Sequence, residues 1–303
     1  MPSFSETRRQ FLHSTVAVGT ALAAAPAAPL LPAVTFGKHC VTRLITGSNP
    51  LFGYSHFNRI LDQSMRDWMT QDRRLELLHR SQAAGINTWQ FHYSEQTLAD
   101  LARLRAEGGK LQVFVLGMGE MEKDPAVIAK VAALGPIGIA HHGGTTDDRF
   151  RKGEMPVVRE FCRRVRDSGV MVGVSTHNPE VVDFIESADW DVDYYMTCLY
   201  RVSRTREEAR AAFGEAPVGE IYMEKDPERM CRAVRQTKRP CLAFKLLGAG
   251  RNISSRQQVE GAFRFAFEHI KPSDAVIVGM FPKYKDEITE NAEIVRQVAG
   301  PVT

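Results

Sequence analysis

Cysteine is scarce in this 303-residue sequence, and its placement follows no pattern. The five residues are Cys40, Cys162, Cys198, Cys231 and Cys241, and no two of them form a C-x-x-C pair. An odd, scattered set does not make the disulfide framework of a small secreted domain. We therefore expect most of these thiols to be small, buried side chains of an ordinary core.

An excess of charge of either sign is also missing. Lys and Arg number 39 against 36 Asp and Glu, a formal net charge of +3. This balance gives no reason to expect nucleic acid or an anionic membrane surface as a partner. The content of 44% hydrophobic and 25% charged residues is that of a globular protein, and it disfavours disordered, collagen-like, coiled-coil and multi-span membrane chains.

The only long uncharged run lies near the N-terminus. The motif TRRQFL at residues 7–12 is followed at 16–31 by an Ala-rich stretch that contains two prolines, with a third directly after it. These 16 residues fall short of the roughly 20 apolar residues that a membrane span needs, which disfavours an N-terminal anchor. The arrangement resembles a twin-arginine (Tat) export signal.

The signal divides the chain into two parts. We expect residues 1–33 to be the signal, with cleavage between Ala25 and Ala33, and residues 34–303 to be one domain. The mature protein is then periplasmic or otherwise extracytoplasmic and has no membrane span. Its expected partners are the Tat translocon during export and a small-molecule substrate.

Strand and helix patterns alternate through the rest of the chain. Short apolar runs predict strands at 42–46, 88–92, 112–116, 137–141, 171–175, 194–199, 241–246 and 275–279. Amphipathic helices are predicted at 73–84, 95–105, 124–134, 157–168, 180–187, 226–237 and 256–269. Eight such units over about 260 residues predict a single α/β domain, a closed (β/α)8 barrel. A doubly wound open sheet is the alternative, but no G-x-G-x-x-G follows the first strand.

One segment interrupts the alternation. Residues 49–72 separate the first strand from its helix and are rich in aromatic side chains. A loop of this length in a barrel is often a lid or a binding loop, and the alternative is an extra helix packed over the rim. Asn49, directly after the first strand, is a candidate substrate-binding residue.

Histidines gather at predicted strand ends, where the chemistry of such barrels is located. They are His92, His141, His142 and His177. Alternation points Gln90 and His92 into the barrel and predicts that they bind substrate. His141, His142 and His177 are candidate acid–base groups. Alternatively, His92, His141 and His177 together are candidate ligands of a divalent metal such as zinc, manganese, cobalt or iron.

Lys245 is the strongest single candidate for catalysis. Alternation places Ala243 and Lys245 on the face opposite Leu242 and Phe244, and we expect this face to be the barrel interior. A lysine at a barrel mouth is costly unless it is paired or used, for instance to form an imine or to move a proton. A structural ion pair is the alternative.

Two further groups are expected to bind substrate. Tyr200 ends the sixth predicted strand, and the turn after the seventh contains Gly248, Gly250 and Arg251. Glycine-rich turns at this point of a barrel commonly hold phosphate through backbone N–H groups, although such glycines also simply permit the turn.

Two short motifs carry a family resemblance. GVSTHNPE lies at residues 173–180, and VIVGM at 276–280 is followed by ITEN at 288–291. Both are similar to motifs of the aldo/keto reductases. The resemblance spans roughly residues 42–298, but it is patchy. It implies a (β/α)8 barrel and carbonyl reduction by a nicotinamide cofactor, NAD(P), with an Asp, Tyr, Lys and His tetrad.

The chain departs from that family at the tetrad. Gln90 stands at the position of the Asp, Glu95 at that of the Tyr, and Gly117-Met118-Gly119 at that of the Lys. Only the His has a counterpart, His141 or His142. The resemblance therefore supports the barrel strongly and reductase activity poorly.

The nucleotide motif is also incomplete. Phe281-Pro282 replaces a Lys-Ser pair and Glu287 replaces an Arg, which disfavours the 2′-phosphate of NADPH. The sequence favours Lys and His proton-transfer chemistry on a small carbonyl or polyol, that is an isomerase, epimerase or lyase. The alternatives are an NAD(P)(H)-dependent oxidoreductase and a barrel that binds a ligand without catalysis.

Overall fold

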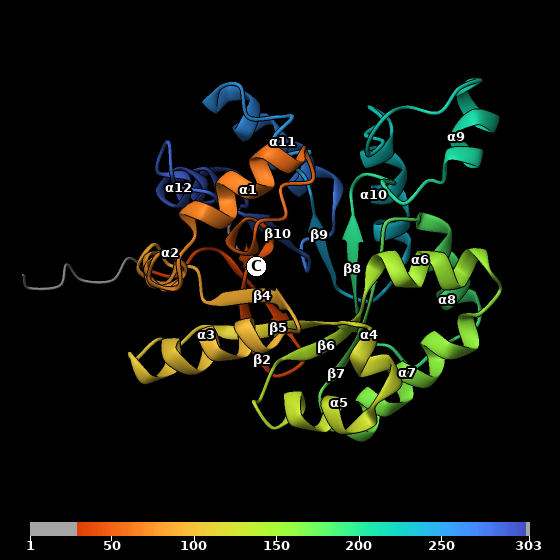
Figure 1. The fold of residues 1–303 in the computed structure, drawn as a ribbon, viewed down its shortest axis with the longest axis horizontal. Helices are drawn as coiled ribbons and strands as arrows, with labels where there is room; N and C mark the ends of the chain where they lie inside the picture. The colour runs from red at the N-terminus through yellow and green to blue at the C-terminus, as the bar shows by residue number, and fades with distance from the viewer. Residues whose placement is uncertain (1–28, 301–303) are drawn as a thin grey trace, which may run out of the picture.

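Eight parallel strands close into a barrel, as the alternating pattern predicts (Figure 1). The strands are β3 (Leu44–Gly47), β4 (Thr88–His92), β5 (Gln112–Gly117), β6 (Gly138–His141), β7 (Met171–Thr176), β8 (Tyr194–Cys198), β9 (Cys241–Phe244) and β10 (Ala275–Gly279). Closure comes from β10, which pairs with β9 on one side and with β3 on the other. The computed structural model describes residues 29–300, so the predicted export signal lies almost entirely outside the described residues.

Helices surround the barrel. The crossover helices are α2 (Gln71–Ala83), α3 (Glu95–Ala106), α5 (Pro125–Ala132), α7 (Met155–Asp167), α8 (Pro179–Ser187), α10 (Asp226–Gln236), α11 (Arg256–His269) and α12 (Glu287–Val298). Shorter segments are η1 (Asn49–Phe52), α1 (Arg59–Trp68), α4 (Gly119–Lys123), α6 (Gly143–Arg151) and α9 (Arg206–Phe213). Between residues 29 and 300, no helix has both the length and the apolar character of a membrane span.

Side-chain alternation along the strands builds two hydrophobic layers. Trp89 and Phe91 of β4 are fully buried in the layer between barrel and helices. Phe114 and Tyr194 fill the barrel interior, in a separate cluster. Gly173 leaves room for that tyrosine, because a Cβ at this position would lie 2.3 Å from its ring. The strands therefore form a packed core rather than a pore.

A β-hairpin closes the amino end of the barrel, and the sequence analysis missed it. It consists of β1 (Ala33–Phe36) and β2 (His39–Thr42), joined through Gly37 at φ +57°. The Phe36 ring lies 5.6 Å from that of Phe114 inside the barrel. The first predicted barrel strand, 42–46, includes only Thr42 of this hairpin, and β1 was not predicted.

The packed domain begins slightly before the expected boundary at residue 34. Leu31 is 2% exposed, and its N–H donates to the carbonyl of Gly85 over 3.0 Å. The carbonyl of Pro32 accepts from the N–H of Arg43. A cleavage site before Leu31 would keep these contacts.

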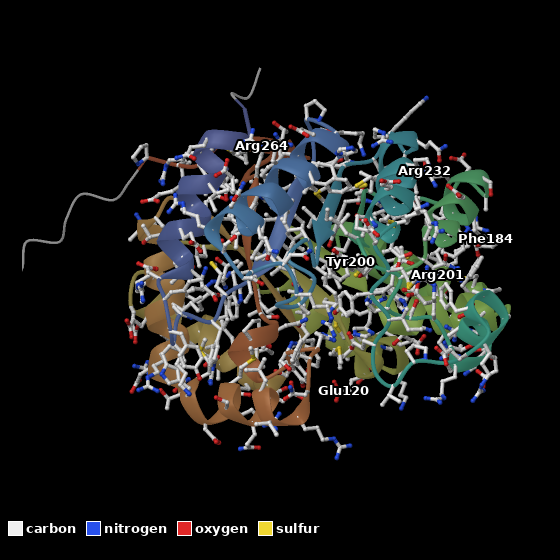
Figure 2. All side chains as sticks on the ribbon, turned by 90° about the horizontal axis from the view of Figure 1, so that it is seen from above. Glu120, Phe184, Tyr200, Arg201, Arg232 and Arg264 are labelled. Atoms are coloured by element: carbon white, nitrogen blue, oxygen red, sulfur yellow. The ribbon has the colours of Figure 1, made fainter. Side chains whose placement is uncertain are left out.

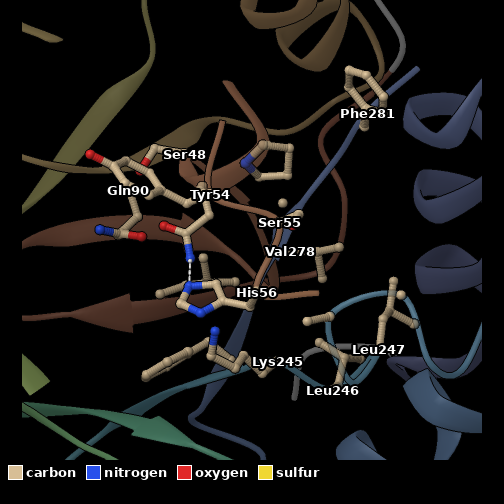
Figure 3. Close-up of a pocket in the computed structure, with 18 of the residues that line it drawn as sticks. Ser48, Tyr54, Ser55, His56, Gln90, Lys245, Leu246, Leu247, Val278 and Phe281 are labelled. Carbon is tan, nitrogen blue, oxygen red and sulfur yellow. Dashed lines mark hydrogen bonds between the residues drawn. The ribbon is translucent and has the colours of Figure 1, made fainter. Parts of the chain in front are cut away.

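Residues 49–72 contain both a helix and a loop. The 3₁₀ segment η1 leads to an irregular stretch that ends at Asn58, whose side chain accepts from Leu61 N–H and so begins α1. The helix packs over the rim, whereas Tyr54, Ser55 and His56 line a cavity (Figure 3). The two interpretations that the sequence left open each hold for one part of the segment.

Candidate active site

A cavity of about 700 Å³ opens at the carboxyl ends of the strands. Its walls come from the segments that follow β3, β4, β6, β7, β9 and β10, and from the loop around Glu220. Volume and position are those of a ligand site in a (β/α)8 barrel. The close-up in Figure 3 shows Lys245 and His56 at its centre, with Gln90 on the opposite side from Leu247.

His177, directly after β7, is oriented by a buried aspartate. Its Nδ1 lies 2.8 Å from Oδ2 of Asp147 on α6, and its backbone N–H donates to the same oxygen over 3.0 Å. Burial alone would raise the pKa of Asp147, but hydrogen bonds from His177, Thr176 and Ser203 hold it below its ordinary value. The carboxylate accepts, so Nδ1 carries the proton and Nε2 is left as a base on a cavity-lining ring.

His142 lines the same cavity as a neutral imidazole. Burial first, and then the neighbouring His177 and His141, lower its pKa to about 4. Its Nδ1 accepts from the N–H of Thr145 over 3.3 Å and caps α6, so Nε2 carries the proton and can donate. Gly143 permits the close approach here, since a Cβ would lie 2.8 Å from Oγ of Ser175.

His141 faces the other way. Its ring packs 4.9 Å from that of Phe161 on α7, while Nδ1 lies 2.7 Å from the Thr146 hydroxyl and Nε2 3.5 Å from a Glu122 oxygen. It is 2% exposed and does not line the cavity. Consecutive residues at a strand end point to opposite faces, so of the two histidines only His142 is placed for catalysis.

The predicted metal set is wrong for the same reason. With His141 turned toward α7, the histidines predicted as ligands do not converge on one point. Throughout residues 29–300, no three His, Cys, Asp or Glu side chains are grouped so that they could hold a metal ion. The described side chains therefore do not fit the divalent metal that the sequence analysis considered.

Gln90 and His92 line the cavity, as their alternation predicts. The His92 ring lies between two aromatic rings, 5.2 Å from Phe52 and 5.4 Å from Tyr54. Burial lowers the pKa of His92, so this imidazole is neutral at pH 7. That Gln90 and His92 contact the substrate remains a prediction.

Lys245 reaches the cavity, but not for the predicted reason. Leu242 and partly buried Phe244 belong to the barrel-interior cluster and Ala243 to the outer layer, so regular alternation would turn Lys245 toward the helices. The strand instead ends at Phe244, and Lys245 adopts φ +62°, which redirects its side chain. A left-handed conformation at a non-glycine residue is costly and is often found at functional sites.

The Lys245 ammonium has no carboxylate within ion-pair distance in the described part of the chain. Burial lowers its pKa and Arg251 lowers it further, while Cys198 and Glu220 act in the opposite direction. The alternative of a structural ion pair is therefore not supported, and an amine of this kind suits catalysis.

A second histidine–carboxylate pair lies beside Lys245, and the sequence analysis did not find it. Nδ1 of His56 lies 2.6 Å from Oε1 of Glu220, and the Asn49 amide donates to Nε2 over 3.1 Å (Figure 3). Burial alone would raise the pKa of Glu220, but His56 and Lys245 hold it below its ordinary value. Glu220 lies in an irregular stretch far along the chain, so no local pattern marks it. Asn49 lines the cavity, as its candidacy requires.

The three residues predicted to hold phosphate use their N–H groups within the turn. The amides of Gly248, Gly250 and Arg251 donate to carbonyls within the turn itself. The Arg251 guanidinium stacks 3.8 Å over the ring of Tyr222 and donates to the His56 carbonyl. Of the three predicted residues, Gly250 lines the cavity, whereas Gly248 and Arg251 organise its rim.

Tyr200 also supports the rim rather than lining the cavity. Its hydroxyl accepts from the Asn252 amide over 3.0 Å, and its ring lies 5.0 Å from that of Tyr222. Figure 2 shows Tyr200 near the middle of the molecule, with Phe184 at the edge. A direct contact of Tyr200 with substrate is therefore not supported by its position.

The positions that correspond to the reductase motifs are divided between surface and cavity. Glu95 is exposed and paired with Lys130 over 2.9 Å, outside the cavity. Glu287 lines the cavity and accepts from the N–H of Phe281; burial raises its pKa. Asn291 also lines it, is 3% exposed, and forms no side-chain hydrogen bond with the rest of residues 29–300.

Comparison with known proteins identifies the fold. No protein-family profile and no curated protein sequence matches the chain. Among solved structures, it is similar to a truncated 3-deoxy-D-arabino-heptulosonate 7-phosphate synthase from Thermotoga maritima, with TM-score 0.52, 14% identity and coverage of 88% of this chain and 91% of that one. It is similar to apo Gox0644, with TM-score 0.51, 11% identity and coverage of 89% and 94%.

The chain is also similar to a third solved structure, that of the glycerol dehydrogenase AKR11B4 from Gluconobacter oxydans. Its TM-score is 0.48 at 13% identity, with coverage of 90% of this chain and 98% of that one. The likeness to the first two structures, at 14% and 11% identity, shows a shared barrel and leaves the chemistry open. Function must therefore be argued from the cavity.

Proposed function

We propose that the chain is an enzyme that moves a proton at the carbon beside the carbonyl of a small carbonyl or polyol substrate. The reaction would be an isomerisation, epimerisation or elimination. One observation carries the proposal: His177, oriented by Asp147, and the partly buried Lys245 ammonium, which has no ion pair within residues 29–300, line the same cavity. A base and an electrophile around one bound carbonyl are the groups that enolisation needs.

His177 would begin the reaction. Its Nε2 takes the proton from the carbon beside the carbonyl, and the C–H electron pair becomes the double bond of an enolate as the carbonyl oxygen gains the negative charge. Asp147 holds the ring in the required tautomer and stabilises the imidazolium that forms. Isomerisation is complete when the proton returns to the former carbonyl carbon and the proton of the adjacent hydroxyl passes to the enolate oxygen, so that the carbonyl moves to the deprotonated carbon. Return of a proton to the same carbon from the opposite face gives epimerisation. Transfer of the proton to a departing hydroxyl on the next carbon completes elimination as water.

Lys245 and His142 would stabilise the enolate oxygen. The Lys245 ammonium supplies a full charge, and the neutral His142 supplies an N–H donor. In its neutral form, Lys245 could instead condense with the carbonyl to an imine with loss of water, and the imine nitrogen then receives the electron pair. Gln90 and Asn49 would orient the hydroxyl groups of the substrate.

Deuterium exchange tests the proposal directly. The mature protein is incubated in D2O with a panel of hydroxy ketones and sugars, and the loss of the C–H signal beside the carbonyl is followed by NMR. We expect His177→Ala and Lys245→Met each to reduce exchange by about a thousandfold. Lys238→Met, at an exposed position outside the cavity, is the matched control.

The outcome separates catalysis from binding. Exchange that survives both substitutions in folded protein would refute the proposal. If wild-type protein binds a panel member without any exchange, and the substitutions only weaken that binding, then the chain is a ligand-binding barrel.

A divergent reductase is the second candidate, and Asn291 is the observation that favours it. Its buried amide faces the cavity beside Glu290, in the segment that resembles the reductase nucleotide motif. Because Glu287 stands where the 2′-phosphate is expected, the cofactor would be NADH rather than NADPH. A fluorescence titration should then give a micromolar Kd for NADH, weakened about tenfold by Asn291→Ala.

We further propose export of the folded protein by the Tat route, on the basis of the motif at residues 7–12. Replacing both arginines with lysine should leave the precursor inside the cell. Detection of processed protein outside the cytoplasm despite that change would contradict this assignment.

A further inference from the structure

The cavity is larger than a small carbonyl compound needs. A compound of about six non-hydrogen atoms leaves most of about 700 Å³ empty, because cavities of that size hold drug-sized ligands. The histidines and Lys245 account for one part of the lining. A further group of lining residues is apolar and is here called the tail arm: Leu61, Met65, Leu247, Val278 and Phe281.

The tail arm is apolar and built from separate elements. Leu61 and Met65 lie on the same face of α1, four residues apart, and Val278 and Phe281 come from the end of β10 and the segment after it. Met65, Val278 and Phe281 are 7%, 3% and 8% exposed. Figure 3 shows Leu247, Val278 and Phe281 on the side of the cavity away from Gln90.

The charges around the tail arm disfavour an anionic ligand. Glu287 and Glu290 line this end of the cavity, and the one lysine there, Lys285, is already paired with Glu290 over 2.6 Å. In the turn after β9, the amides of Gly248, Gly250 and Arg251, which the sequence predicts to hold a phosphate, donate within the turn. Burying a phosphate here would leave its charge without a partner.

The rim is apolar too. Tyr54, Ile253 and Tyr284 line the cavity and are 52%, 38% and 75% exposed. Exposed apolar side chains that surround a cavity mark a binding surface. Of these, Tyr284 lies next to the tail arm, with its ring 6.1 Å from that of Phe281, so a ligand longer than the arm would still bury apolar surface there.

From this arrangement we infer that the substrate carries an uncharged apolar tail. The class is a hydroxy carbonyl compound whose polar head meets Lys245, His142 and His177, and whose alkyl or aryl tail occupies the tail arm. The inference rests on the proposed function for the head group, while the tail is argued from the arm itself. It narrows the substrate from the sugar-like compounds that the sequence favours to amphipathic ones.

A chain-length series tests the inference. The probes are 1-hydroxy-2-alkanones of about four to about ten carbons, and binding is measured calorimetrically on mature protein carrying His177→Ala, so that turnover does not interfere. Each buried methylene should tighten binding about three- to fourfold. A 1-hydroxy-2-alkanone that ends in a phosphate should gain nothing from its added group.

Neighbouring residues on α1 provide the variant and its control. Leu61→Gln places an amide in the tail arm and should reduce the gain per methylene to less than twofold. Ile60→Gln changes the adjacent side chain, which is 84% exposed and does not line the cavity, and should leave the gain unchanged. Val278→Thr, close in shape to the original residue, repeats the test from β10.

The possible results are distinct. Affinity independent of chain length, equal gains per methylene in all variants, or tighter binding of the phosphate-ended probe would each overturn the inference. The inference would also be overturned if the affinity for the alkanones did not depend on chain length and Leu61→Gln abolished the binding of NADH. A gain per methylene that depends on Leu61, in a protein without any exchange activity, would establish the tail arm and refute the proposed proton transfer.

Discussion

The two ends of the barrel differ in how their side chains are packed. At the amino end, Phe36 of the hairpin is fully buried against Phe114 and Tyr194, and the interior is filled. At the carboxyl end, the strands stop around a cavity where Lys245 is held without an ion pair in the described chain and in a left-handed conformation. One end is optimised for packing, whereas the other holds groups that cost stability.

This difference separates stability from chemistry within one fold. Substitutions at the filled end should lower stability and leave the activity of each folded molecule unchanged. Substitutions at the open end should remove activity. They should lower the stability of the fold only slightly, or even raise it, because strained and desolvated groups are kept there for function.

The largest expected effect concerns the filled end. Phe36→Ala should lower the free energy of unfolding by about 3–5 kcal/mol, because it removes a fully buried ring and leaves a cavity. Ile253→Ala on the rim, 38% exposed, should cost less than about 1 kcal/mol. Denaturant titrations of both variants measure the contrast, and equal losses would contradict it.

His142 should make stability depend on pH. Its pKa is about 4 in the folded protein against an ordinary 6.5, so between these values the unfolded chain binds a proton that the folded protein does not. The contribution of the neutral His142 to the free energy of unfolding is complete above pH 6.5. It is lost as the pH falls toward 4, which lowers the free energy of unfolding by up to about 3 kcal/mol.

His142→Asn tests this dependence. Asparagine can still cap α6 but does not titrate, so the loss of stability between pH 6.5 and 4 should be smaller than in the wild type. Unfolding curves at several pH values in this interval give the comparison. An unchanged pH dependence would show that His142 is not the group responsible.

Lys245→Met should have the smallest effect on stability, and it should be a gain. Methionine occupies a similar volume at the same backbone angles without a desolvated charge, so we expect an increase of up to about 1 kcal/mol at pH 7. Burial lowers the pKa of the lysine, so the stability penalty is greatest below that lowered pKa and has disappeared once the pH exceeds the ordinary value of 10.5. A clear loss of stability would mean that Lys245 makes contacts that hold the fold together.

Local patterns were sufficient where side chains follow the regular period of a strand. Gln90 and His92 lie on the predicted face, and the barrel itself follows from eight alternating units. His141 and His142 show the limit of this reasoning, because a position at a strand end does not tell which of two neighbours faces the mouth. Only the packing of His141 against Phe161 decides it.

Loops are the second place where local sequence patterns do not predict the site. His56 and Glu220 are 164 residues apart and belong to no periodic segment, so only closure of the barrel brings them together beside Lys245. Lys245 itself was placed correctly through a wrong face assignment, since its positive φ reverses the regular alternation. Backbone conformation at an irregular position depends on its neighbours in space, and the local sequence does not contain them.

The sequence by itself therefore determined the barrel, the face of a regular strand such as β4 and the residue types available for acid–base chemistry. Those properties depend on hydrophobic periodicity, which is local. The tertiary structure alone decided which side chains share the cavity, which carboxylate orients which histidine, and that much of the cavity is apolar. Those properties depend on residues distant in the chain that meet only when β10 pairs with β3.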